Sequence, residues 1–261
     1  MAMNGKFPPA LLSRIEDAGL NASAPPQQRW LDGWLVRVSP GKAKRARCIN
    51  AVAQGKLSIE DRLAECETVY AQAGLPLIVR ITPFTQPEGL DAWLSARGHL
   101  RFDDTCVMVS NALPEHVEPP PAGLVFEHAT HASFADRIGA LRDSPPDQRL
   151  AHAERLRWSP VPYQGWLLKR ADDGAMLACA QTAVEAGMVG LYDVFTDPAS
   201  RGQGLARWLC RELLRQAREG GAHTAYLQVD AANEAARSVY RALHFDDAYG
   251  YHYRSKFADA H

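Results

Sequence analysis

The chain has 261 residues, a formal net charge of −1, 46% hydrophobic residues and 23% charged residues, which excludes a wholly disordered protein and allows one or two domains. Positive and negative charges balance in both halves, with 13 of each up to residue 118 and 16 against 17 beyond it. This balance argues against a nucleic-acid-binding domain and against a surface that binds anionic membranes.

The N-terminal part is predicted to alternate helix and strand. Ser58 is a candidate N-cap with Asp61 three residues later, and Gly74 supplies a helix end. The segment 114–123 carries four prolines, and such a backbone continues neither a helix nor a central strand. We therefore place a domain boundary there and expect domains over 1–118 and 119–261. The predicted N-terminal elements are a helix over 58–73, a strand over 77–81, a helix over 87–97 and a strand over 105–109.

The C-terminal part is predicted to be a second mixed α/β unit of about 140 residues. Leucines recur at helical spacing over 205–219, and Gly220-Gly221 ends that helix. A shift of 146 residues lays the N-terminal element order over the C-terminal one and places Gly74 on Gly220, so we interpret the chain as a tandem repeat of one fold. The predicted strands are 124–127, 166–169, 176–184, 188–196, 225–229 and 249–254, and the predicted helices are 133–141, 148–158, 205–219 and 233–243.

The cysteines and histidines favour a reduced protein without metal. The five cysteines are widely spaced and form no C-x-x-C pair, so we expect mostly buried thiols. The nine histidines lack an H-E-x-x-H motif and any close pairing with cysteine, so no metal is expected. No leader pattern opens the sequence, and the most apolar stretch, 174–195, is interrupted by polar residues. We expect a cytoplasmic protein that neither crosses nor binds a membrane.

Residues 194–206, Val-Phe-Thr-Asp-Pro-Ala-Ser-Arg-Gly-Gln-Gly-Leu-Ala, join a predicted strand to a predicted helix. Gly202 and Gly204 allow the backbone to approach a ligand, and the first N–H groups of the helix have no partner within it. With Arg201 beside them, these groups are suited to a phosphate. A plain Gly-rich turn with a solvated arginine is the competing interpretation. A dinucleotide-binding motif is disfavoured because Arg207 stands where a third glycine is needed.

These residues resemble a known family. Arg201-x-x-Gly204-x-Ala206 resembles the acyl-CoA-binding motif of the GCN5-related N-acetyltransferases (GNAT), and Asn233-x-x-Ala236-x-x-Val239-Tyr240-x-x-x-His244-Phe245 is similar to their second signature, which usually ends in Gly-Phe. The resemblance covers about residues 122–254. It implies a GNAT fold, α/β with a central, mostly antiparallel sheet and flanking helices, here with two similar halves in tandem. It also implies acetyl-CoA as donor and a primary amine as acceptor.

The resemblance further implies how acetyl-CoA would be held. The strand before the turn would splay from its neighbour, so that the backbones of Val194 and Thr196 pair with the pantetheine arm. The amide of Val194 or Phe195 would polarise the thioester carbonyl, and Asn233 would reach the pantetheine. The diphosphate would lie on the amides of Arg201, Gly202, Gln203, Gly204, Leu205 and Ala206.

Transfer of the acetyl group also requires proton movements. Tyr240 is our candidate proton donor to the departing thiolate, because a phenol is protonated at pH 7; the competing interpretation is a tyrosine that packs its helix onto the sheet. For the base, Gly190 stands where some family members carry a glutamate. Asp193 is the nearest acid and our candidate, with Glu185 or a chain of waters as alternatives.

The N-terminal half lacks the donor motif, since the segment before helix 58–73 reads Ala53-Gln-Gly-Lys-Leu57. We interpret this half as a degenerate copy that completes the sheet or covers the acceptor site. Lys42-Ala-Lys-Arg-Ala-Arg47 is either a solvated loop or a contact for a phosphate or acidic substrate. The sequence thus predicts an acetyl-CoA-dependent N-acetyltransferase of a small-molecule amine, as a monomer or homodimer. A non-catalytic acyl-CoA sensor, an enzyme that acetylates protein N-termini or lysines, and a ligand-free scaffold are the alternatives.

Overall fold

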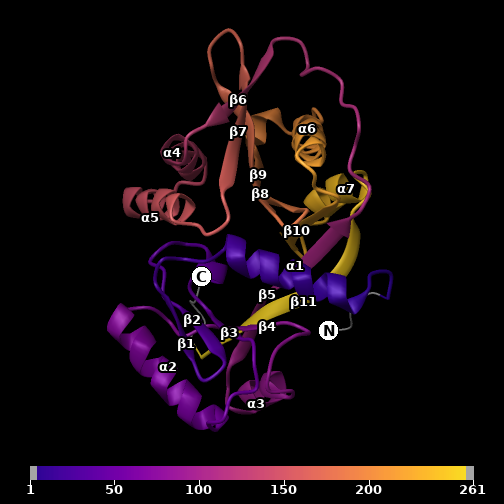
Figure 1. Ribbon diagram of the computed structural model, residues 1–261. Coiled ribbons are helices and arrows are strands. Elements are labelled where there is room, and N and C mark those ends of the chain that lie inside the picture. Colours follow the sequence, from indigo (N-terminus) through magenta and orange to yellow (C-terminus); the bar gives the residue numbers. More distant parts are fainter. Residues whose placement is uncertain (1–4, 257–261) are drawn as a thin grey trace.

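In the computed structural model, residues 5–256 are described, and they form a mixed α/β fold around one eleven-stranded sheet (Figure 1). The strands are β1 (Gln28–Leu31), β2 (Trp34–Arg37), β3 (Ile49–Ala51), β4 (Val79–Ile81), β5 (Leu100–Ser110), β6 (Leu124–Ala129), β7 (Tyr163–Arg170), β8 (Met176–Glu185), β9 (Met188–Thr196), β10 (Thr224–Asp230) and β11 (Asp246–Ser255). The helices are α1 (Pro9–Ala22), α2 (Ile59–Ala73), α3 (Leu90–Ala96), α4 (His131–Leu141), α5 (Pro146–Arg157), α6 (Leu205–Glu219) and α7 (Glu234–Arg241), with short 3-10 turns at Lys44–Ala46 and Pro198–Ser200.

The sheet has the strand order β1-β2-β3-β4-β11-β5-β10-β9-β8-β7-β6. Two neighbouring pairs are parallel, β3 with β4 and β9 with β10, and a helix connects the strands of each pair, α2 in the first and α6 in the second. The other neighbours are antiparallel. The predicted α/β class and mostly antiparallel sheet are therefore confirmed, and the two strand–helix–strand units match the predicted repeat.

The two halves of the chain exchange their last strands. β5 ends the N-terminal half but pairs with β10, and β11 ends the C-terminal half but pairs with β4. β5 and β11 also pair with each other, from Asp246↔Val109 to Ser255↔Leu100. Figure 1 shows β11 passing from the upper half of the molecule, which holds α6 and α7, into the lower half beside β4. The sheet is thus continuous across the boundary at 114–123, and the division into domains 1–118 and 119–261 stays a proposal.

Helices cover both faces of the sheet around β9 and β10. On β5, Val107 and Val109 pack in a cluster that includes residues of α1, α4 and α5. Cys106 and Met108, which alternate with them, pack in a cluster with α6 and α7. The region around β9 and β10 is therefore covered by α1, α4 and α5 on one face and by α6 and α7 on the other.

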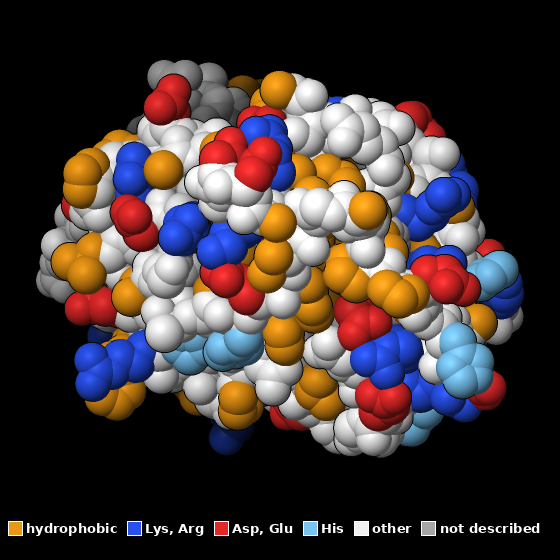
Figure 2. Space-filling model, turned by 90° about the horizontal axis from the view of Figure 1, so that it is seen from above, with side chains coloured by type: hydrophobic (Ala, Val, Ile, Leu, Met, Phe, Trp, Pro, Cys, Tyr) orange, Lys and Arg blue, Asp and Glu red, His pale blue; other side chains and the backbone are white. Residues whose placement is uncertain are grey.

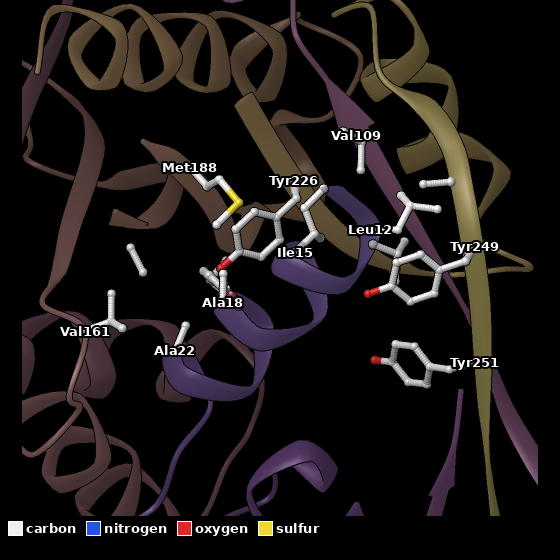
Figure 3. Close-up of a cluster of buried hydrophobic side chains, with 14 of the residues drawn as sticks. Leu12, Ile15, Ala18, Ala22, Val109, Val161, Met188, Tyr226, Tyr249 and Tyr251 are labelled. Carbon is white, nitrogen blue, oxygen red and sulfur yellow. Dashed lines mark hydrogen bonds between the residues drawn. The ribbon is translucent and has the colours of Figure 1, made fainter. Parts of the chain in front are cut away.

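The first helix, α1, joins the two halves. Leu12 of this helix lies beside Tyr249 of β11, and Ile15 and Ala18 lie beside Tyr226 of β10 (Figure 3). Ala22, at the end of the helix, lies toward Val161 in the same cluster. Glu16 on the same helix is buried, pairs with Arg80 of β4 and accepts a hydrogen bond of 2.7 Å from the Tyr249 hydroxyl. Through these polar and apolar contacts, α1 of the N-terminal half packs on β10 and β11 of the C-terminal half.

The surface carries mixed charge, and the five cysteines are buried. On the face shown in Figure 2, Lys, Arg, Asp and Glu side chains lie interspersed with hydrophobic ones. Cys48, Cys66, Cys106, Cys179 and Cys210 are all buried free thiols, as expected. Over residues 5–256, no helix is both long enough and apolar enough to cross a membrane, and no group of three His, Cys, Asp or Glu side chains gathers as metal ligands.

Candidate active site

The turn between β9 and α6 leaves the start of the helix open. Gly202 and Gly204 have φ values of 77° and 75°, in the left-handed region that favours glycine, and Gly204 is the N-cap of α6. Within residues 5–256, no side chain caps this helix, and its first turn holds no acid. A Cβ built on either glycine meets no atom of the described residues within 4 Å. The first N–H groups of α6 therefore face open space with the positive end of the helix dipole behind them, which suits an anion.

β9 and β10 separate next to this turn. Their parallel pairing runs from Met188↔Thr224 to Leu191↔Leu227, while β9 continues to Thr196 and β10 to Asp230. On its other side β9 stays paired with β8, up to Thr196↔Ala178. This is the splay that the family resemblance implies.

The alternation of the antiparallel ladder fixes which backbone groups face the splay. Asp197 N–H donates to Leu177 O at 2.8 Å, so the paired positions on β9 that exchange hydrogen bonds with β8 are Asp197 and Phe195. The N–H and C=O groups of Val194 and Thr196 consequently point away from β8, toward the splay. Arg201 Nε lies 3.4 Å from Thr196 O, which places the guanidinium at the mouth of the splay.

Asp193 lies at a bulge in β9, and its carboxylate contacts the side chains of Arg142 and His152. It has φ 48°, and the β8–β9 register shifts here. Its carboxylate is 2.8 Å from Arg142 of the α4 end and 3.3 Å from His152 Nε2 of α5, the latter without hydrogen-bond geometry. Burial alone would raise the pKa of Asp193, but His152 and Arg142 outweigh it and hold that pKa far below its ordinary value. A carboxylate held by these two side chains is less basic than a free one, and its role as the base that takes the amine proton stays a hypothesis.

The position of Gly190 excludes a glutamate there. A Cβ built on it would lie 2.5 Å from Tyr192 Cε2 and 2.7 Å from the Tyr226 hydroxyl. The hydroxyl groups of these two tyrosines form a buried hydrogen bond of 2.8 Å with each other. The other alternative, Glu185, ends β8 and accepts a 2.9 Å hydrogen bond from Asn21 of α1, so it ties α1 to the sheet.

Tyr240 lies on α7 and is buried in the cluster that covers the α6 face of the sheet. Val194 of the splayed strand packs against the same cluster. Burial and then the neighbouring Cys210 raise the pKa of Tyr240 above its ordinary value, so the phenol stays protonated. Asn233 is the N-cap of α7, where its side-chain oxygen accepts a 3.0 Å hydrogen bond from Ala236 N–H.

His244 departs from the glycine of the family signature at a position with left-handed backbone. Its φ is 63°, and Phe245 N–H closes the end of α7 on Tyr240 O at 3.0 Å. The glycine-like conformation is thus kept with a histidine in place, at the cost of some local strain.

The corresponding turn in the N-terminal half is filled by the chain itself. Lys56 N–H and Leu57 N–H donate to the Asp32 carboxylate at 2.8 and 2.7 Å, and Ser58 caps α2. Beside β3, Gln86 N–H donates to Ala51 O at 2.8 Å. The Asp32 carboxylate therefore occupies the backbone N–H groups that correspond to the anion site of the C-terminal half. The Gln86 amide likewise occupies the backbone carbonyl that corresponds to its open strand edge.

Some residues of the site were not found from the sequence. Gln181 on β8 is fully buried beside the bulge, and neither atom of its amide has a hydrogen-bond partner among the described residues. Arg142, Arg149 and His152 of α4–α5 surround Asp193 or line a pocket next to it. Their position depends on the packing of α4 against β7 and of α5 against α4, so spacing along the chain could not reveal it.

The chain is similar to known acetyltransferases. The acetyltransferase (GNAT) family model matches residues 132–245, from α4 to the end of the second signature. The C-terminal half of the chain therefore belongs to the GNAT family. This family uses an acyl-CoA co-substrate.

Whole-chain similarity extends over both halves. The uncharacterized N-acetyltransferase YobR of Bacillus subtilis is 25% identical over 232 residues, which cover 88% of this chain and 92% of that protein. The structure of a GCN5-related N-acetyltransferase from Kribbella flavida superposes with a TM-score of 0.67 at 18% identity, covering 93% of this chain and 94% of that one. A tandem GNAT protein from the clavulanic acid biosynthesis pathway gives a TM-score of 0.57 at 14% identity, covering 77% and 70%. These structures show that the fold is that of tandem GNAT proteins.

Proposed function

We propose that the chain is an acetyl-CoA-dependent N-acetyltransferase with its donor site at the splay of β9 and β10 and a small primary amine as acceptor. The proposal is supported by two features that lie next to each other, the separation of β9 from β10 and the open start of α6. The strands separate after Leu191 and Leu227, and the opening leads to a helix start where Gly202 and Gly204 carry no side chain and adjoin open space. An extended arm with amide groups fits the strand edge, and a diphosphate fits the helix N–H groups.

Acetyl-CoA supplies an activated thioester at this site. The backbone groups of Val194 and Thr196 would hold the arm, and Arg201 with the amides of 202–206 would hold the diphosphate. Because the N–H of Phe195 is directed to β8, we assign the polarisation of the thioester carbonyl to Val194. Each of these groups is fixed by the sheet or the helix, so little reorganisation is needed in the reaction.

Tyr240 would donate a proton or hydrogen bond to the sulfur as the carbon–sulfur bond breaks. We assign no proton-accepting role to Asp193, whose carboxylate anchors Arg142 and His152. The proton of the attacking amine would leave through water. This assignment keeps the sequence-based role of Tyr240 and changes the role of Asp193 from base to anchor.

Release of free CoA thiol tests the proposal directly. The purified chain is incubated with acetyl-CoA and a panel of primary amines, and thiol release is followed with a colorimetric thiol reagent while thermal unfolding is monitored with and without acetyl-CoA. Amine-dependent release together with a raised Tm is expected. A raised Tm without release for any amine would favour the acyl-CoA sensor, and an unchanged Tm would refute the donor site.

A further inference from the structure

The pocket next to the proposed reaction site is lined by both halves of the chain. It has a volume of about 240 Å³ and lies between residues 39–43 of the N-terminal half and the helices α4 and α5. Asp193 lines it as well, one residue before the backbone that faces the splay. A group bound in this pocket is therefore close to Val194, which makes the pocket the natural place for part of the acceptor.

The charge of the pocket is strongly one-sided. Among the described residues that line it, four side chains are cationic and Asp193 is the single carboxylate. The whole chain has 29 cations and 30 anions, so this excess is local. The cationic side chains are Lys42, Arg142, Arg149 and Arg155.

The carboxylates available within the described residues leave part of this charge uncompensated. Arg142 is paired with Asp193 at 2.8 Å. Arg149 reaches Asp136 at 3.3 Å, but 73% of the Asp136 side chain is exposed, so solvent screens this pair. Arg155 lies over the Tyr163 ring, 5.7 Å from its centre, and Lys42 has no ion pair within residues 5–256. Cations gathered without anions repel one another, and a bound anion would relieve that repulsion.

The chain is shaped to keep these side chains at the pocket. A Cβ on Gly139 of α4 would lie 2.5 Å from Arg149 Cγ, so the glycine makes room for the arginine stem. In the cationic run 42–47, Lys44 pairs with Asp103 and Arg45 donates to Gln228 at 2.7 Å, which anchors the loop. Lys42 is left to extend over the pocket. The sequence allowed the run 42–47 to be either a solvated loop or an anion contact. In the structure, Lys44 and Arg45 anchor the loop and Lys42 lines the pocket.

We infer that the acceptor is an amine that also carries an anionic group, a carboxylate or a phosphate, which binds between Lys42 and Arg155 while the amine faces the splay. This inference rests on the proposed function and adds the substrate class. It also assigns the degenerate half a part in substrate recognition, because Lys42 comes from that half. The pocket volume suits a small acceptor and not a folded protein surface.

The test measures binding and turnover of matched amines with the full chain. The pairs are phosphoethanolamine with ethanolamine and β-alanine with β-alaninamide, each titrated calorimetrically in the presence of CoA and each assayed for thiol release with acetyl-CoA. The anionic member of at least one pair should bind about tenfold more tightly or better, and the excess should shrink with added salt. Preference for the phosphate or the carboxylate member identifies the anion.

Variants separate this inference from the proposed function. Lys42→Gln and Arg155→Gln should remove most of the tenfold preference, mainly as a rise in KM, while Lys42→Arg keeps it. Arg97→Gln, which removes an exposed cation paired with Glu60 elsewhere, should change nothing. Equal or weaker binding of both anionic members, or full preference in both glutamine variants, would overturn the inference. Anion preference without thiol release from any amine would uphold the pocket and refute the acetyltransferase activity instead.

Discussion

At the residue scale, local motifs were readable from the sequence and spatial partners were not. Tyr240 and the Gly202–Gly204 turn belong to short signatures whose spacing is visible in the chain. The environment of Asp193 depends on Arg142, which is 51 residues away and reaches it because α4 packs on β7 of the same sheet. The crowding at Gly190 likewise depends on Tyr226, from a different strand. The residues of the candidate donor site could therefore be proposed from the sequence, whereas the ion pairs that lower the pKa of Asp193 could not.

Replacement of Tyr240 by phenylalanine tests the proton donor. Tyr240→Phe keeps the ring that packs with Phe245 and removes the hydroxyl, so we expect kcat and kcat/KM to fall together by about 10²-fold. Affinity for acetyl-CoA should change little in calorimetry. Tyr70→Phe, which removes the hydroxyl of a buried tyrosine in the other half, is the matched control and should keep its kcat. An unchanged rate in Tyr240→Phe, with chemistry rate-limiting, would assign this tyrosine to packing.

Asp193 should contribute stability that depends on pH. Its pKa is lower in the folded chain than in the unfolded one, so its contribution is complete above the unfolded value near 4 and is lost as the pH falls below it. Asp193→Asn should therefore destabilise the chain by about 2 kcal/mol at pH 7 and by about 1 kcal/mol less at pH 3. Urea unfolding at the two pH values measures this. A difference between wild type and variant that does not shrink at low pH would contradict the ion pairs.

At the element scale, the clarity of the hydrophobic pattern decided whether the sequence revealed an element. The predicted bounds of β9 and α6 match the structure, because a long strand and a helix with regularly spaced leucines carry clear periodicity. β1, β2 and β3 have only three or four residues and were not predicted. α1 was also missed, although Leu12, Ile15, Ala18 and Ala22 follow a helical spacing. Small residues on that face weaken the pattern and at the same time allow α1 to lie close to the sheet.

The start of α6 provides a matched test of the anion site. Gly204→Val should abolish the rise in Tm that acetyl-CoA causes, because a branched side chain would fill the open approach to the helix N–H groups. Gly89 is the N-cap of α3, with the same left-handed conformation and equally open space. Gly89→Val should cost similar stability, about 1–2 kcal/mol, and keep the acetyl-CoA shift. Loss of the shift in both variants, or in neither, would refute the site.

At the scale of the whole molecule, the sequence predicted the repeat but not the exchange of strands. The strands at 105–109 and 249–254 were expected, and their alternating residues show which faces are buried. Which strand each one pairs with is decided by long-range closure of the sheet, and nothing local encodes it. The exchange gives each half a strand that the other half needs.

Separated halves should therefore fail to fold. Residues 119–261 alone would leave β10 without β5 and β11 without both of its neighbours, exposing apolar strand edges. We expect this fragment to be aggregated or unfolded by circular dichroism and gel filtration, and co-expression with residues 1–118 to restore a soluble complex. A monomeric 119–261 fragment with native-like cooperative unfolding would contradict the importance of the exchanged strands.

The number of CoA molecules bound by each chain tests the central claim most directly. The C-terminal half presents an open helix start beside splayed strands, whereas Asp32 and Gln86 occupy the corresponding groups in the N-terminal half. Titration of the full chain with CoA by isothermal calorimetry should give one site per chain. Two equivalent sites would show that the N-terminal half also binds, and the absence of any site would contradict the assignment of β9, β10 and α6 as the donor site.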